Sequence, residues 1–150
     1  MSSIRQKNAD NRIATARQMT EGAGYNYDWG SFYDGVAPPE PDELPAFCFI
    51  DPDESLDFGP NPLMDRVTYG EFKGMHSAPE PQDQYPTARR MIEDIERNQA
   101  GDFTVGGLAV TVQLARASIF AEYPTSDRVT VVIPFELRYR TTLTDPSDAR

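Results

Sequence analysis

Apolar and polar residues alternate along the stretch DRVTVVIPFELRYR, near the end of the chain. A period of two predicts a strand that buries one face and leaves the other toward solvent. The buried face would hold Val129, Val131, Ile133, Phe135, Leu137 and Tyr139, while Thr130, Pro134, Glu136, Arg138 and Arg140 stand between them. This is the clearest strand in the sequence.

Three further strands are expected. The run PAFCFI (45–50) is short, apolar and aromatic, which is typical of a buried strand. A second lies within 65–76, although two glycines weaken it; its shared face would hold Val67, Tyr69, Glu71 and Lys73. Alternation of Leu108, Val110, Val112 and Leu114 predicts a long strand within 103–120, which AEYPTSD joins to the closing strand as an antiparallel hairpin.

Two segments have the spacing of helices. After YPT, with Thr87 as the expected N-cap, apolar residues fall at helical intervals until Ala100 and Gly101 end the helix. These residues are Ala88, Met91, Ile92 and Ile95. Residues 4–20 form a weaker pattern through Ile13, Ala16 and Met19. The order of elements predicts an α+β fold: a two-layer sandwich with a mixed or antiparallel sheet of about four strands, two helices packed on one face, and a long C-terminal β-hairpin.

The length of 150 residues fits a single domain spanning 1–150. Around 22–45 the chain is rich in aromatic residues and prolines, which predicts an insertion or arm. Its aromatic residues Tyr25, Tyr27 and Trp29 have two interpretations: they either extend the core or form a contact surface, since large aromatic side chains concentrate at interface centres.

The net charge of −10 argues against a protein that binds nucleic acid by neutralising phosphates. Residues 18–65 contain no Lys or Arg but many acids, so this segment is either a solvated acidic surface or a site for a basic protein. No apolar run is long enough to span a membrane, and the first residues lack the pattern of a signal peptide. We therefore expect a soluble protein made in the cytoplasm, with no membrane partner.

The residues that could perform chemistry are few. Cys48 is the only cysteine and lies in an apolar run, which predicts a buried thiol. His76 is the only histidine, so a zinc site is not expected, and it is predicted to lie at the surface or anchor a loop. The stretch DPDESLD lacks the glycine and glutamate of a calcium loop and predicts a solvated acidic turn. We expect no catalytic, cofactor-binding or metal-binding residue, and we do not expect the protein to be an enzyme.

Several short motifs in the C-terminal half form a recognisable set. They are Ala88, Asp94 and Ile95 in the second helix, Gly106, Gly107 and Val110 in the next strand, and Tyr139, Arg140, Thr141, Asp145 and Pro146 at the end. In this order they resemble the tail terminator proteins of long-tailed bacteriophages and gene transfer agents. The arm around 22–45 departs from the compact form of that family.

The resemblance implies a structural virion protein at the tail–neck junction, assembled in the host cytoplasm. Such proteins form a ring, expected here to be a homohexamer, that caps the tail tube, ends its polymerisation and joins it to the neck. The implied partners are further copies of the chain, the tube protein and a neck or head-completion protein, while genomic DNA passes through the lumen without specific binding.

The residues expected at subunit or partner contacts are Arg138, Tyr139, Arg140, Tyr25, Tyr27 and Trp29. An alternative for Arg138 and Arg140 is that they only solubilise the outer face. Two other functions stay open. One is a head-side neck or head-closure protein. The other is a small ligand-binding domain or enzyme, which would need a polar pocket around His76, Asp65 and Glu71.

Overall fold

The computed structural model describes residues 3–58, 63–100 and 111–142. Within them the elements follow the order α1 (Ile4–Ala16), η1 (Glu21–Ala23), β1 (Ser31–Asp34), β2 (Ala46–Phe58), β3 (Leu63–Ser77), η2 (Pro81–Asp83), α2 (Gln84–Ala100), β4 (Thr111–Leu114), β5 (Ser118–Ala121) and β6 (Arg128–Thr142). The sheet order is β1-β2-β3-β6-β4, and β5 also pairs with β6. Only β1 and β2 are parallel, so the sheet is mixed.

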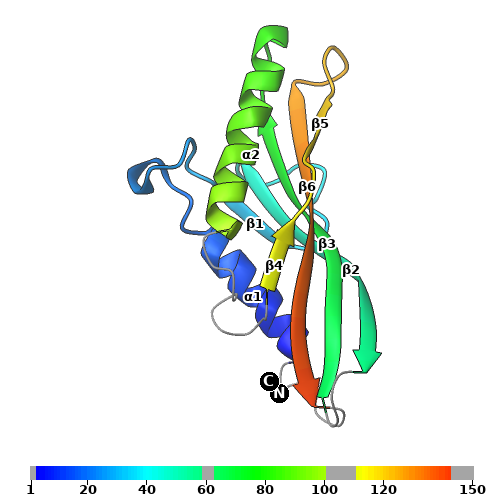
Figure 1. Cartoon of the computed structure of the whole chain (residues 1–150). Helices are drawn as coiled ribbons and strands as arrows, with labels where there is room; N and C mark the ends of the chain where they lie inside the picture. Colours follow the sequence, from blue (N-terminus) through cyan, green and yellow to red (C-terminus); the bar gives the residue numbers. More distant parts are fainter. Residues whose placement is uncertain (1–2, 59–62, 101–110, 143–150) are drawn as a thin grey trace.

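Both helices lie on the same side of this sheet (Figure 1), with α1 against β1 and β2 and α2 mainly against β6 and β3. The predicted class is therefore confirmed: an α+β fold with two helices on one face of a mixed sheet. The sheet holds six strands in the described residues, more than the four or so expected.

The strands β3 and β6 form a long antiparallel ribbon through the middle of the sheet. Their register runs without a shift from Leu63 opposite Thr142 to Ser77 opposite Arg128. The alternation predicted for β6 is correct, because the side chains from Val129 to Tyr139 on the helix face are all buried. Phe72 and Phe135 stack there with ring centroids 4.5 Å apart, and α2 places Met91 on the same core.

The two glycines of β3 do not weaken this strand; they let other parts of the chain come close. A Cβ at Gly70 would lie 2.0 Å from the carbonyl oxygen of Ile50. At that point β2 shifts its register between Ile50 and Asp53, as a β-bulge does. A Cβ at Gly74 would meet the ring of Trp29 at 2.9 Å, on the helix side of the sheet.

The helix boundaries differ from those expected. Helix α1 ends at Ala16 rather than residue 20, and Met19 is buried just beyond it. Helix α2 begins at Gln84, before the expected cap, so Thr87 lies inside the helix and is buried. Pro86 is tolerated because an N–H in the first turn has no partner within the helix.

The predicted acidic turn DPDESLD is wrong, because β2 continues through it to Phe58. Pro52 falls in the register shift, where a missing N–H disturbs no regular ladder. The acidic side chains are then compensated locally: Arg5 of α1 pairs with Asp51 at 3.1 Å, and Arg66 of β3 pairs with Glu54 at 2.9 Å.

The predicted long strand 103–120 is interrupted. Residues 101–110 lie outside the described residues, and the remainder forms two four-residue strands, β4 and β5, separated by residues 115–117. The interruption lies beside Pro134 of β6, whose carbonyl oxygen accepts a hydrogen bond from the Ala115 N–H at 2.8 Å. Strand β5 pairs with β6 in antiparallel register, so the closing hairpin is confirmed.

Replacing Gly70 by alanine is expected to destabilise the protein, because the new methyl group would collide with backbone rather than with a movable side chain. We expect a cost of about 2–3 kcal/mol, or a fall in melting temperature of roughly 5–10 °C. Thermal unfolding followed by circular dichroism measures this. Gly22→Ala is the control, because a Cβ there meets only the Thr20 Oγ1 at 4.0 Å. Equal stability of the two variants would contradict the close approach.

Candidate interaction surface

The face of the sheet opposite the helices carries a mixture of apolar and charged side chains. Register places Tyr69, Glu71 and Lys73 of β3 on this outer face, next to Val132 and Glu136 of β6. Tyr69 is 40% exposed, and Phe120 of the neighbouring β5 is 55% exposed. Pairs of opposite charge lie close on this face, including Lys73 with Glu71 at 4.0 Å.

One part of this face is covered by the chain itself. Cys48 faces outward by register, opposite Lys73, yet it is only 1% exposed because residues 35–45 cross over it on their way from β1 to the parallel β2. The predicted buried thiol is therefore confirmed. Burial raises the pKa of Cys48, although a backbone hydrogen bond from Ala37 opposes that shift.

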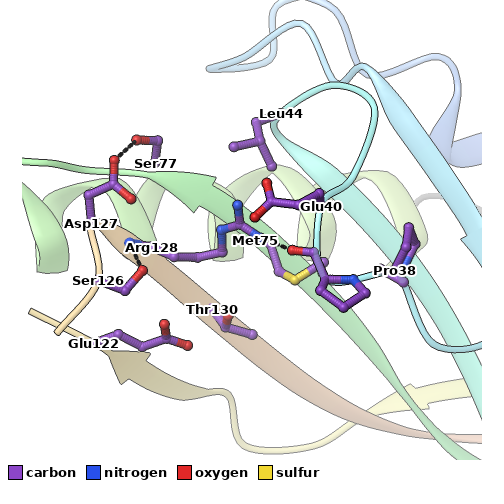
Figure 2. Close-up of a pocket in the computed structure, with 12 residues that line it drawn as sticks. Pro38, Glu40, Leu44, Met75, Ser77, Glu122, Ser126, Asp127, Arg128 and Thr130 are labelled. Atoms are coloured by element: carbon purple, nitrogen blue, oxygen red, sulfur yellow. Dashed lines mark hydrogen bonds between the residues drawn. The ribbon is translucent and has the colours of Figure 1, made fainter.

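Beside this crossing segment the surface is hollowed into a cleft of about 610 Å³ (Figure 2). Its far wall is the β5–β6 hairpin, and Met75 of β3 lies at its base. The guanidinium group of Arg128 donates to the carbonyl oxygen of Pro39 at 3.1 Å, which ties the two walls together. The carboxylates lining the cleft are those of Glu40, Glu122 and Asp127.

A second hollow, of about 470 Å³, continues the first toward the centre of the outer face and shares Glu122 and Thr130 with it. Phe120 and Val132 give this part an apolar lining. Together the two hollows offer carboxylates and apolar side chains over one continuous surface. Such a combination suits contact with a protein surface better than the enclosure of a small molecule.

The arginines Arg138 and Arg140 lie on the same outer face, toward the opposite end of β6. Their side chains are 53% and 43% exposed. Each is held by a neighbouring carboxylate: Arg138 by Glu136 at 3.3 Å, and Arg140 by Asp65 at 2.5 Å. These contacts orient the guanidinium groups while leaving them accessible.

Tyr139, between the two arginines in sequence, points the other way and is 3% exposed. Its hydroxyl group donates to Glu54 at 2.7 Å, and the buried Thr68 donates to the same carboxylate oxygen at 3.2 Å. Arg66 completes this cluster by also donating to Thr141 at 2.9 Å. Burial and the hydrogen bond to Glu54 raise the pKa of Tyr139, so its phenol stays protonated and the cluster is suited to holding β2, β3 and β6 together.

The aromatic residues of the arm pack against the body of the protein through Asp94 of α2. The backbone N–H groups of Asn26 and Tyr27 donate to its carboxylate at 2.8 and 3.2 Å, and the Trp29 indole N–H donates at 3.0 Å. Asp94 and Trp29 are 2% and 5% exposed, and Tyr25 and Tyr27 are half-buried. A contact of these aromatic residues with a partner stays a prediction.

The structure does not bring together the three residues of the alternative enzyme site. Asp65 and Glu71 lie on the outer face, six residues apart along β3, whereas His76 lies on the helix face against Tyr27, with ring centroids 4.8 Å apart. His76 thus anchors the loop that carries Tyr27. Neither helix of the described residues is long and apolar enough to cross a membrane.

No protein-family model matches this chain, and no curated protein matches it in sequence. Among solved structures it is similar to a chain of the "Virion of native gene transfer agent (GTA) particle", with 13% identity and a TM-score of 0.42 over 91% of this chain and 90% of that one.

The cleft was not expected from the sequence: of its acidic residues, only Glu40 belongs to the acidic segment 18–65. Glu40 belongs to the arm and Glu122 to the final turn, and they line the same cleft only because residues 35–45 cross the outer face. The available signal was the pair of prolines before Glu40, which indicates an extended segment. Its path over β2 and β3 depends on tertiary packing.

Asp94→Ala should release the arm, because one carboxylate accepts hydrogen bonds from two backbone N–H groups and an indole. We expect a loss of about 3 kcal/mol in the free energy of unfolding. Trp29 is the only tryptophan, so a red shift of its emission reports its exposure directly. Glu93→Ala, at an exposed neighbouring position, should change neither quantity. Unshifted emission in Asp94→Ala would mean that the arm is held by other contacts.

Acidification is expected to destabilise the protein through His76. Burial lowers the pKa of this imidazole in the folded state, so the unfolded chain takes up its proton first as the pH falls below about 6.5. The contribution of neutral His76 to the free energy of unfolding is fully present above that pH and decreases below it. Urea unfolding should show that the free energy of unfolding falls more between pH 7.5 and pH 5.5 in the wild type than in His76→Gln. Identical losses would show that His76 does not contribute.

Proposed function

We propose that this chain is a structural virion assembly protein, and specifically a tail terminator: a ring that caps the head-proximal end of a phage-type tail tube, ends its polymerisation and joins it to the neck. The observation that carries the proposal is the outer face of the sheet, where the accessible guanidinium groups of Arg138 and Arg140 lie at one end, an acidic cleft lies at the other, and apolar side chains lie between them. A surface of this composition is suited to protein–protein assembly.

The residues that resemble the terminator family support the proposal in a second way. Asp94 binds the arm to α2, and Thr141 accepts a hydrogen bond from Arg66 within the Glu54 cluster. Arg140 instead faces outward. The motif therefore combines residues that maintain the domain with one, Arg140, whose guanidinium group is paired with Asp65 but still accessible to another subunit.

The proposed partners are further copies of the chain in a homohexameric ring, the tube protein and a neck or head-completion protein. The net charge of −10 suits a ring around passing DNA, because carboxylates repel phosphates and would not retain them. The location that follows is the junction of tail and neck in the virion.

The test is electron microscopy of particles from a producing strain that lacks this gene, with tail length and head attachment scored together. Overlong tubes detached from filled heads support the proposal. Tails of normal length beside unattached heads would overturn the terminator in favour of a neck or head-closure protein. Unchanged particles would overturn both.

The double substitution Arg138→Glu and Arg140→Glu should lower the yield of complete particles without unfolding the domain, because both side chains lie on the open face. We expect at least a tenfold loss of yield, with a melting temperature within a few degrees of the wild type. Arg89→Glu with Arg90→Glu is the matched control, since these exposed residues lie on α2, on the other side of the sheet. A normal yield with the first pair would refute the assembly role of the arginines.

A further inference from the structure

The outer face has opposite charges at its two ends. The three segments that meet at one end, residues 36–44, 77–84 and 121–128, contain Arg128 as their only Lys or Arg. Against it stand the acidic residues Glu40, Asp42, Glu43, Glu80, Asp83, Glu122 and Asp127. At the other end of β6 lie the exposed guanidinium groups of Arg138 and Arg140.

The cleft at the acidic end is already formed without a partner. Arg128 uses its guanidinium group to hold the Pro39 carbonyl oxygen, and the Ser77 hydroxyl group donates to Asp127 at 3.0 Å. Figure 2 shows Glu40 and Glu122 on opposite walls of this space. Both are exposed, and within the described residues neither carboxylate makes a hydrogen bond or an ion pair.

Arg138 and Arg140 retain hydrogen-bond donors that could bind the carboxylates of an acidic cleft. Within the described residues, Arg138 donates to Glu136 through one terminal nitrogen, and Arg140 donates to Asp65 through Nε. A guanidinium group has five N–H donors, so each keeps several directed outward. A carboxylate on another surface can therefore add to these contacts without displacing them.

We infer that Arg138 and Arg140 of one copy dock into the acidic cleft of the next copy, at Glu40 and Glu122. This inference rests on the proposed ring and identifies the contact that would build it. The two ends are about 40 Å apart along β6, so one chain cannot join its own patches.

The geometry favours a head-to-tail contact over a two-fold dimer. The β3–β6 ribbon twists along its length (Figure 1), as long antiparallel pairs do, so the two ends of the outer face point in different directions. One flat partner surface cannot engage both ends at once. Patches that are complementary but point apart produce heterologous contacts, which close into rings when the rotation permits.

The experiment measures the self-association of the purified full-length chain by sedimentation velocity at 50 mM and 500 mM salt. The wild type is expected to form a complex larger than a dimer at low salt and to dissociate at least tenfold more readily at high salt. Either pair of substitutions, Arg138→Glu with Arg140→Glu or Glu40→Lys with Glu122→Lys, should leave only monomer. Asp127 is kept because it holds Ser77.

The decisive variant carries all four substitutions, because the charges at positions 40, 122, 138 and 140 are then all reversed and the contacts between these positions are again attractive. Restored assembly supports the inference, as does retained assembly in the matched control Arg89→Glu with Arg90→Glu. A quadruple variant that stays monomeric although folded by circular dichroism overturns it, as does a wild type that remains monomeric or stops at a dimer. The two proposals can fail separately. If the deletion strain makes overlong tails but self-association does not depend on these charges, this contact is rejected and the terminator function is retained.

Discussion

The unbroken pairing of β3 with β6 is the constraint on which the rest of the structure depends. Because the register has no shift over the 15 residues of each strand, alternate side chains of β6, from Val129 to Tyr139, are fixed on the face that the helices cover. Helix α2 can then cover that face along its length. The same register sets the acidic cleft and the arginine pair at opposite ends of the other face, so the core and the candidate surface have one origin.

The fold was predictable wherever periodicity alone decides the outcome. Strand β6 and helix α2 have clear periods, and both exist close to where they were expected. The extension of β2 was not predictable, because Asp51 and Glu54 become acceptable in a strand only when Arg5 and Arg66 reach them. The glycines of β3 were misleading for a similar reason: they are needed because Ile50 and Trp29, from elsewhere in the chain, pack closely against their backbone.

The candidate surface was predictable only in part. The outward orientation of Arg138 and Arg140 follows from the alternation of β6, and the structure places them there. The role of Asp94 did not follow, because its three donors come from a segment about 65 residues away in sequence. A charged residue on a helix is expected to be solvated, whereas Asp94 is buried as the anchor of the arm.

The interruption between β4 and β5 has a consequence for how copies of this chain meet. In the described residues, the outermost strands on both sides of the sheet, β1 on one and β4 and β5 on the other, are each only four residues long. Along β1, β4 and β5, backbone groups in such short stretches give a neighbour little to extend, so strand addition is disfavoured there, whereas β2 continues past β1 from Ile50 to Phe58. On those short edges association is left to side chains, whose contacts can form and separate reversibly.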